Sequence, residues 1–359
     1  MSAILGPLSG KDGKPLLVEF APQRLREAGE DPVAAIDVWR AQGWRARGAQ
    51  VELPEDPGQL VLAIDATDPP VAQLHLERVD PPPTAWERLL PAERRLGRTW
   101  ARRFPPVEPG TLAYDAAHRA LVGGLLDDAD WQRLFATGDA LPAGLGAGYD
   151  ERVVEYPWLF SRGMSGRVLD AGSVLNHRHV LERMLEQAEG VTIATLAPEP
   201  LAFTSLGVSY LYADLRELPL RDDWFDEVVC LSTLEHVGMD NSSYGAAATR
   251  AADPGAEAAR ALRELLRVVK PGGRVHLSVP FGRSEDHGWF RQFDRAAVET
   301  LFAGAGVVRR EEVVFAHSPK GWRRVDLDQA ADAAYNATPA RGSDLAVAAR
   351  AVYCATVYA

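Results

Sequence analysis

Residues 167–177 read Arg-Val-Leu-Asp-Ala-Gly-Ser-Val-Leu-Asn-His, and this stretch decides the fold. An apolar strand is followed by an acid, by a glycine turn and then by an amphipathic helix, which we expect over about residues 175–188. This order is typical of the first strand of an open α/β sheet, whose carboxyl end presents a ligand site. We therefore expect the ligand site to begin at this strand tip.

Strands and helices alternate regularly after Gly166. The pattern predicts five strands, at residues 167–172, 191–196, 209–213, 227–232 and 274–279. The helix-length segments between them, including residues 256–269, imply crossover connections and hence a largely parallel sheet. Two last strands, expected at residues 307–315 and 347–357 with no clear helix between them, indicate an antiparallel edge pair. The predicted fold is thus an α/β domain with seven strands, most of them parallel.

Two further segments precede this domain, which we expect to span residues 161–359. Residues 1–79 show a small α/β pattern, with strands expected at 16–20, 44–53 and 59–64 and helices at 22–28 and 31–42. The run Asp-Pro-Pro-Pro at residues 80–83 cannot continue a helix or a strand. Residues 80–160 are therefore expected to form a proline-rich linker and a helical region, which ends in a helix with an aromatic lid at residues 150–160.

The composition restricts the partners of the protein. A net charge of −11 argues against binding to nucleic acid or to anionic lipid, because an acidic surface repels phosphates. Cys230 and Cys354 lie in apolar runs and are expected to be reduced core residues, with no disulfide and no metal site. No apolar run approaches the length needed to span a bilayer, so we expect a cytoplasmic protein.

Acidic and hydroxyl side chains follow the predicted parallel strands. The ends of the first four strands carry Asp170, Gly172, Ser173, Thr195, Asp214 and residues 232–236, which begin with Ser232. This set contains neither lysine nor arginine, so a pyrophosphate would be bound poorly there. A ligand that carries an ammonium and a sulfonium would be attracted instead. The sign of the charge favours S-adenosylmethionine over a dinucleotide.

The region from Gly166 to the C-terminus resembles the class I S-adenosylmethionine-dependent methyltransferases, which have a Rossmann-like fold. The resemblance is carried by four segments in order: Val-Leu-Asp-Ala-Gly at 168–172, Asp-Leu-Arg-Glu-Leu-Pro-Leu at 214–220 with Phe-Asp-Glu-Val-Val at 225–229, Leu-Glu-His at 234–236, and Leu-Leu-Arg-Val-Val-Lys-Pro-Gly-Gly at 265–273. It implies that Asp170 and Gly172 line the methionine end of the cofactor. Asp214 and the backbone of Leu215 would hold the adenine, and Ser173, Thr195 and Ser232 are further candidates for cofactor contacts.

Two departures from this family pattern concern the cofactor site. Val174 stands where a second glycine is common, and a positive φ there would be costly, so the loop must take another path. Asn176 could accept a left-handed conformation in its place. Thr195 replaces the carboxylate that usually holds the ribose hydroxyls, and Glu199 is a possible substitute from the next loop.

Two histidines are candidates for a catalytic base. Methyl transfer from a sulfonium mainly requires alignment, but an oxygen or nitrogen acceptor also has to lose a proton. His236 follows the fourth strand and His287 follows the fifth, so either could take that proton. Residues 114–160, 238–254 and 281–293 are expected to shape the acceptor pocket.

A weaker resemblance concerns the N-terminal segment. Leu-Leu-Val-Glu-Phe at 16–20, Arg-Leu at 24–25 and the stretch between Trp39 and Trp44 resemble the closing part of an FkbM-type methyltransferase domain. It covers about residues 4–76. We expect a small-molecule or glycan-type acceptor for the chain, and this resemblance favours the glycan type. The alternative is a non-catalytic binding or scaffold protein. A nucleotide-sugar dehydrogenase or epimerase is disfavoured because no Gly-x-Gly-x-x-Gly follows the first strand.

Overall fold

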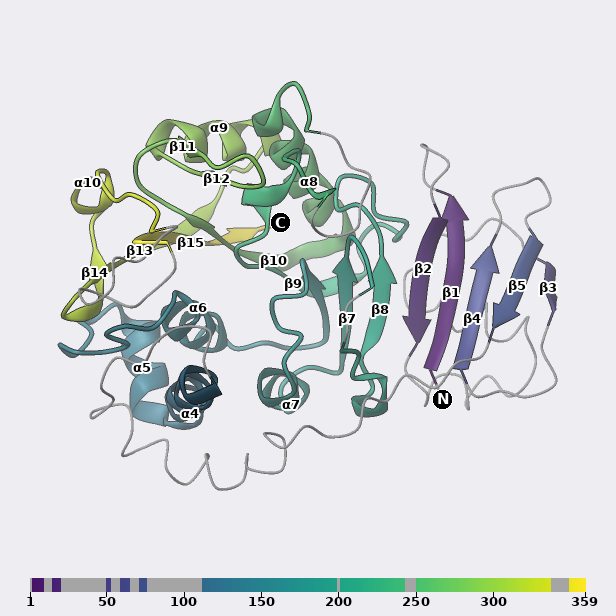
Figure 1. Ribbon diagram of the computed structural model, residues 1–359, viewed down its shortest axis with the longest axis horizontal. Coiled ribbons are helices and arrows are strands. Elements are labelled where there is room, and N and C mark those ends of the chain that lie inside the picture. The colour runs from purple at the N-terminus through teal and green to yellow at the C-terminus, as the bar shows by residue number, and fades with distance from the viewer. Residues whose placement is uncertain are drawn as a thin grey trace.

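The computed structural model describes residues 112–198, 201–242, 250–336 and 349–359, and the backbone of five short strands nearer the N-terminus. Its main sheet contains eight strands from the C-terminal region: β6 (Arg167–Ala171), β7 (Gly190–Thr195), β8 (Ser209–Tyr212), β9 (Phe225–Cys230), β10 (Val269–Pro280), β13 (Arg310–Ser318), β14 (Gly321–Val325) and β15 (Ala351–Tyr358). They lie in the order β14-β13-β15-β10-β9-β6-β7-β8 (Figure 1). This arrangement confirms the predicted Rossmann-like fold.

The direction of the strands changes along the sheet. The neighbours from β10 to β8 are parallel, whereas β15 runs antiparallel to both β10 and β13. The predicted antiparallel edge pair is therefore present as β13 and β15. The predicted number of seven strands is one too low, because the chain turns after β13 and adds β14 as a hairpin partner at the edge.

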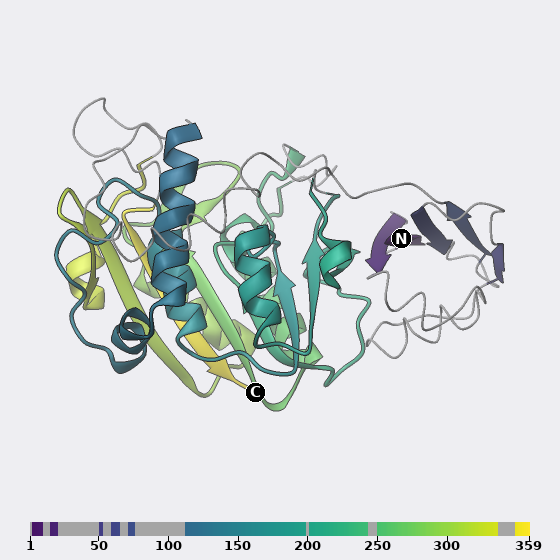
Figure 2. The same ribbon diagram turned by 90° about the horizontal axis from the view of Figure 1, so that it is seen from below.

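Successive residues of the strands face opposite layers of helices. In β9, Val228 belongs to the core beneath α8 (Pro254–Val268) and α9 (Arg295–Ala305), whereas Val229 belongs to the core on the other face. That second face is covered by α4 (Leu112–Asp127), α5 (Ala129–Thr137), α6 (Arg152–Phe160) and α7 (Arg178–Leu185). The helices lie above and below the sheet in Figure 1, and Figure 2 shows α4 and α7 across the second face. This is the three-layer arrangement of an open α/β sheet.

The aromatic side chains of α6 lie in the core. Tyr156, Trp158 and Phe160 are buried, and the hydroxyl of Tyr156 donates to the carbonyl of Val174, 2.6 Å away. The helix itself was predicted correctly, but the aromatic lid was not, because these rings pack between the sheet and α4 and α5. The first helix after β6 is also shorter than expected, since residues before Arg178 form a loop.

The backbone of the N-terminal region continues the sheet. Strand β2 (Pro15–Phe20) pairs antiparallel with β8, and β1 (Ser2–Ser9), β4 (Gln59–Ile64), β5 (Val71–His75) and β3 (Gln50–Glu52) follow beyond it. Strands β2 and β4 lie where strands were predicted, and β3 covers only the end of the range 44–53. The helices predicted at residues 22–28 and 31–42 lie outside the described residues.

Cys230 and Cys354 are free and buried in β9 and β15, as expected of core residues. Burial raises the pKa of both thiols well above the usual value. Among the helices that the structure describes, none is long and apolar enough to cross a membrane.

Polar side chains of three neighbouring strands, β9, β10 and β15, are hydrogen-bonded to one another within the sheet. His276 of β10 is fully buried, its Nε2 lies 3.1 Å from Oε2 of Glu227 and its Nδ1 lies 2.9 Å from the hydroxyl of Thr356. Arg274 donates to both carboxylate oxygens of Glu227. Burial lowers the pKa of His276 below its usual 6.5, although the bond to Glu227 acts in the opposite direction. The ring therefore resists protonation in the folded state.

We expect the stability of the protein to fall as the pH drops below about 6.5. In that range the unfolded chain binds a proton at residue 276 that the folded chain does not, so this contribution is present above 6.5 and is lost as the pH falls toward the lower folded pKa. Urea unfolding at pH 7.5, 6.5 and 5.5 measures the slope, of which His276 contributes up to about 1.4 kcal/mol per pH unit. The variant His276→Gln should show a shallower slope, whereas Thr356→Val, which keeps the histidine, should show the wild-type slope. Equal slopes for His276→Gln and the wild type would contradict this assignment.

Candidate functional site

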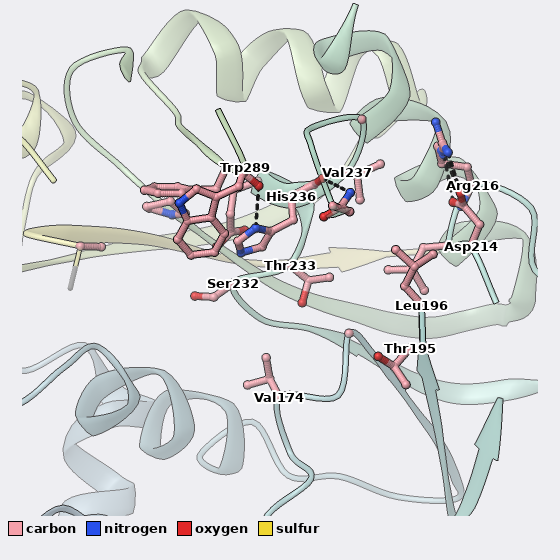
Figure 3. A pocket seen from close by; sticks show the side chains of 18 of the residues that line it. Val174, Thr195, Leu196, Asp214, Arg216, Ser232, Thr233, His236, Val237 and Trp289 are labelled. Carbon is pink, nitrogen blue, oxygen red and sulfur yellow. Dashed lines mark hydrogen bonds and ion pairs between the residues drawn. The ribbon is translucent and has the colours of Figure 1, made fainter. Parts of the chain in front are cut away.

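A cavity of about 410 Å³ lies at the carboxyl ends of the parallel strands, where the strand order reverses between β6 and β9 (Figure 3). Its size is within the range of small-molecule sites. The loops that follow β6 to β10 form most of the wall, and α6 and a segment after α10 (Leu327–Ala330) complete it. The lining residues are Glu151, Arg152, Gly172, Val174, Thr195, Leu196, Ala213, Asp214, Leu215, Arg216, Ser232, Thr233, Glu235, His236, Val237, Gly238, Asn241, Pro280, Trp289, Phe290, Tyr335 and Ala349.

The turn after β6 takes an unusual path at the cavity floor. Gly172 has a φ of +121°, and a Cβ atom there would lie 2.0 Å from Oγ1 of Thr233 in the loop after β9. The next residue, Ser173, adopts a left-handed conformation with a φ of +68°. The chain thus reverses before Val174, and the β-branched residue is spared a positive φ, as the sequence required.

Asn176 does not adopt the left-handed conformation that we considered for it. Its amide instead donates to the carbonyl of Leu201 at 2.9 Å and accepts from the hydroxyl of Tyr210 at 2.8 Å. The side chain therefore ties the turn after β6 to the segment between β7 and β8. Glu199, the proposed substitute for the ribose carboxylate, lies outside the described residues.

Asp170 lies beneath the cavity and does not line it. Its side chain is fully buried, and Oδ2 accepts the backbone N–H of Leu175 at 2.9 Å. The expectation that this carboxylate lines the methionine end is therefore wrong: its position fixes the turn that forms the floor. Ser173 is also buried and does not line the cavity.

One end of the cavity lies over β7 and β8. Thr195, Leu196, Asp214 and Leu215 line it, and the carboxylate of Asp214 is held by Arg216, whose Nε lies 2.9 Å from Oδ1. The same guanidinium donates to Glu257 at 2.6 Å. Arg216 lies outside the set of strand-end residues that was predicted, and its guanidinium is committed to two carboxylates. It leaves little positive charge for an anionic ligand.

His236 and Trp289 form the opposite end, as the labelled side chains in Figure 3 show. Nδ1 of His236 lies 3.0 Å from the carbonyl oxygen of Trp289, and the two rings stack with centroids 4.9 Å apart. A carbonyl can only accept, so Nδ1 carries the proton and the basic lone pair is on Nε2. Burial lowers the pKa of His236, so the ring is neutral at pH 7.

His287, the other candidate base, lies outside the cavity lining. Its ring stacks on Phe290 with centroids 4.4 Å apart, and its Nε2 contacts Glu285 at 3.0 Å. Phe290 itself lines the cavity, so it stands between the imidazole and the site. The position of His287 therefore does not support its predicted catalytic role. Its ring packs behind Phe290 in the cavity wall.

A buried carboxylate joins α6 to the strands. Glu155 is 0% exposed, and its Oε1 accepts from the hydroxyl of Ser232 at 2.7 Å and from that of Ser278 at 2.6 Å. Its other oxygen accepts from Arg152. Ser232 therefore lines the cavity as predicted, but its proton is directed to Glu155. Arg152 also lines the cavity, and its guanidinium is already paired with Glu155.

Two segments of the wall share one anchor. The backbone N–H of Arg283 and the side-chain amide of Gln292 both donate to the carbonyl of Ala333, each at 2.9 Å. Arg283 precedes the small hairpin of β11 (Glu285–Asp286) and β12 (Arg291–Gln292), which carries Trp289 and Phe290, and Gln292 is its last residue. Tyr335 follows the shared carbonyl by two residues and lines the cavity.

Several lining residues fall within ranges that were predicted for the site, although no role was predicted for them individually. Glu235 lies in the predicted range 232–236, and Glu151 and Arg152 lie in residues 114–160, which were expected to shape the acceptor pocket. Tyr335 lies outside every predicted range and had no local signal. The predicted residues that do line the cavity are Gly172, Thr195, Asp214, Leu215, Ser232 and His236.

Comparisons with known proteins agree with this arrangement. Residues 171–277 match the family model of the methyltransferase domain. This match falls on the segment that carries the sequence motifs, and it confirms the resemblance of this segment to methyltransferases. No curated protein matches the chain.

Several solved structures are similar to the chain. The protein YcgJ from Bacillus subtilis is 13% identical, with a TM-score of 0.36 over 57% of this chain and 97% of that one. A possible histamine N-methyltransferase from Thermotoga maritima is 16% identical, with a TM-score of 0.37 over 57% and 88%. The N-methyltransferase NodS from Bradyrhizobium japonicum, in complex with S-adenosylhomocysteine, is 12% identical, with a TM-score of 0.36 over 66% and 96%.

The turn at Gly172 provides a test of the cavity floor. The variant Gly172→Ala should destabilise the protein by about 1–3 kcal/mol from crowding against Thr233, in addition to the cost of its positive φ. It should also weaken S-adenosylhomocysteine binding at least tenfold in calorimetry. Gly163→Ala is the matched control, since Gly163 also has a positive φ but an added methyl group there would meet no described atom within 4 Å. Equal effects of the two substitutions on binding would disprove a role for the close approach.

Proposed function

Since residues 171–277 match a methyltransferase domain, we propose that this protein transfers a methyl group from S-adenosylmethionine to a small-molecule or glycan-type acceptor. The observation that carries the proposal is the continuous cavity that extends from Asp214 to Trp289 across the point where the strand order reverses. Ligands of open α/β sheets bind at this point. The cavity has room at its two ends for a donor and an acceptor group.

The charges around the cavity favour a cationic donor. Three carboxylates line it, from Glu151, Asp214 and Glu235, together with the guanidiniums of Arg152 and Arg216. Both arginines are already paired with carboxylates of the protein. A pyrophosphate would therefore find little uncompensated positive charge, whereas a sulfonium with an ammonium group is attracted.

The residues of the cavity fit the cofactor. Asp214 and the backbone of Leu215 would hold the adenine, and the missing Cβ of Gly172 would allow the ligand to approach the backbone closely. Thr195 can give one hydrogen bond to the ribose. When bound, S-adenosylmethionine supplies a methyl group on a positively charged sulfur. The protein then has to orient the acceptor, exclude water and remove a proton.

His236 is the proposed base. Its Nε2 carries the lone pair because Nδ1 donates to Trp289, and its lowered pKa keeps the ring neutral at pH 7. The imidazole lies at the end of the cavity away from Asp214, where an acceptor would lie. A proton accepted at Nε2 can pass to solvent after each turnover.

The domain division also remains a proposal. We assign residues 1–79 to an FkbM-like remnant, residues 80–160 to a linker with helices and residues 161–359 to the methyltransferase domain. The FkbM resemblance supports a glycan-type acceptor. The contacts of α6 with the sheet indicate that the helical region contributes to the cavity as well.

The alternative is a non-catalytic binding or scaffold protein. Two observations motivate it: Val174 at the position of the usual second glycine and Thr195 in place of the ribose carboxylate. Cofactor binding separates the two functions, because an enzyme has to bind S-adenosylmethionine and its demethylated product.

Calorimetry tests the cofactor site directly. Both S-adenosylmethionine and S-adenosylhomocysteine should bind, and Asp214→Ala should weaken both about 10- to 100-fold, as expected for the loss of a hydrogen bond to a charged group. Asp222→Ala is the matched control, since Asp222 also pairs with an arginine but lies outside the cavity. Absence of binding by the wild type would favour the scaffold function.

The base can be tested through the turnover number. The acceptor for this assay is the compound that becomes labelled when the protein is incubated with tritiated S-adenosylmethionine. With this acceptor, His236→Gln should lower kcat about 100-fold or more. The affinity for S-adenosylhomocysteine should stay within about twofold of the wild-type value. His287→Gln should retain activity, since this ring lies behind Phe290. In the wild type, kcat/KM should fall as the pH drops through the folded pKa of His236, which is below 6.5, because protonation removes the base. Unchanged kcat in His236→Gln would exclude this role.

A further inference from the structure

Among the described residues, two carboxylates at the His236 end of the cavity lack hydrogen-bond partners for one oxygen each. Glu235 belongs to the short helix η2 (Leu234–His236) directly after β9, lines the cavity and is 4% exposed. Its Oε2 is buried and makes no hydrogen bond with any residue that the structure describes. A buried carboxylate oxygen without a donor is costly, so this atom needs a partner that a ligand can supply.

Glu151, at the start of α6, lies near Glu235 and Tyr335, because its negative charge contributes to the raised pKa of both. Its Oε2 is also buried without a hydrogen bond to the described part of the chain, and Glu151 lines the cavity. Nη1 of Arg152 lies 4.0 Å from Oε1, the other oxygen of this carboxylate, but the guanidinium donates to Glu155. The positive charge of Arg152 is therefore already neutralised by a third carboxylate.

Aromatic rings surround the same end. Trp289, Phe290 and Tyr335 all line the cavity, and the rings of Phe290 and Tyr335 lie with centroids 4.6 Å apart. Trp289 is 43% exposed, so the wall reaches the surface of the molecule. Carboxylates among aromatic faces attract an organic cation, through charge and through the quadrupoles of the rings.

We infer that the acceptor is an amine whose protonated nitrogen is bound by Glu235 and Glu151 within the aromatic wall. This inference rests on the proposed methyl transfer and specifies the substrate class of the same site. A hydroxyl acceptor would fill one hydrogen bond, but it brings no positive charge that would favour the ionised form of the two carboxyl groups.

The reaction balances for an amine. The ammonium first loses a proton to a neighbouring base, either a carboxylate of the pair or Nε2 of His236. The nitrogen lone pair then forms the C–N bond to the methyl carbon as the C–S bond breaks. The electron pair of the broken bond stays on sulfur, and the products are the methylated amine in its ammonium form, a neutral thioether and one proton for the solvent.

Burial gives the carboxylates a property that can be measured. Desolvation raises the pKa of Glu151 to about 8 and that of Glu235 well above its usual value. At pH 7 Glu151 is therefore mostly protonated while no cation is bound, and a bound ammonium displaces its proton. Amine binding should release protons into the buffer, whereas binding of a neutral alcohol should not.

The test uses paired probes on the full chain saturated with S-adenosylhomocysteine. Calorimetry at pH 7, in two buffers of different ionisation enthalpy, compares glucosamine with glucose and phenethylamine with phenethyl alcohol. At least one amine should bind tenfold or more tightly than its alcohol, with proton release, and should be methylated when S-adenosylmethionine replaces the product. Glu235→Gln and Glu151→Gln should each weaken amine binding at least tenfold and change S-adenosylhomocysteine affinity less than twofold. Glu186→Gln, an exposed position at the end of α7, is the matched control and should bind as the wild type.

Three results would overturn the inference. If neither amine binds more tightly than its alcohol counterpart, the acceptor is not an amine. Loss of S-adenosylmethionine affinity in Glu235→Gln, with retained thermal stability, would assign the carboxylates to the ammonium of the cofactor. Failure of the wild type to bind S-adenosylmethionine would reject the proposed function itself, and the inference with it. The first two results leave methyl transfer intact, so the two kinds of failure can be distinguished.

Discussion

The buried carboxylate of Glu155 is the interaction on which the rest of the site depends. It receives hydrogen bonds from Ser232 and Ser278, at the ends of β9 and β10, and from Arg152 on its own helix. A charge with no exposure to water is tolerated only when its lone pairs are filled in this way. The bonds fix α6 against the strand tips, and α6 in turn places Arg152 and Glu151 in the cavity wall. Removal of this one carboxylate would leave a buried guanidinium and two hydroxyls without their acceptor.

The parallel part of the fold could be predicted from the sequence because its signals are local. Each strand is an apolar run, each crossover is long enough for a helix, and both features are found within a few residues of one another. The additional strand β14 was missed because it follows β13 after a two-residue turn, Pro319–Lys320, without a separate apolar run. The role of the aromatic residues in α6 depends on contacts with β10 and with the turn after β6, which no local pattern reveals.

The sequence predicted site residues only where a glycine or a polar side chain lies near the end of a strand. Gly172, Thr195, Asp214 and His236 follow strands directly, so topology alone brings them together. Asp170 was misplaced because a residue near the end of a buried strand can face either the ligand or the protein, and here its carboxylate accepts the N–H of Leu175. Glu151 and Tyr335 come from segments far away in the chain, and their position depends on tertiary packing. The arginines in the cavity were overlooked because the strand tips alone do not contain the whole wall.

The carbonyl of Ala333 joins the hairpin that carries Trp289 and Phe290 to the segment that carries Tyr335. Two hydrogen bonds from the hairpin end on this one carbonyl, so a shift of either segment would break both of them. The bonds therefore hold the three aromatic side chains in fixed positions relative to one another. Discrimination among guests on this side then follows lock-and-key complementarity, without remodelling around each guest. Related chains with other preferences would have to exchange these side chains while keeping the backbone that supports them.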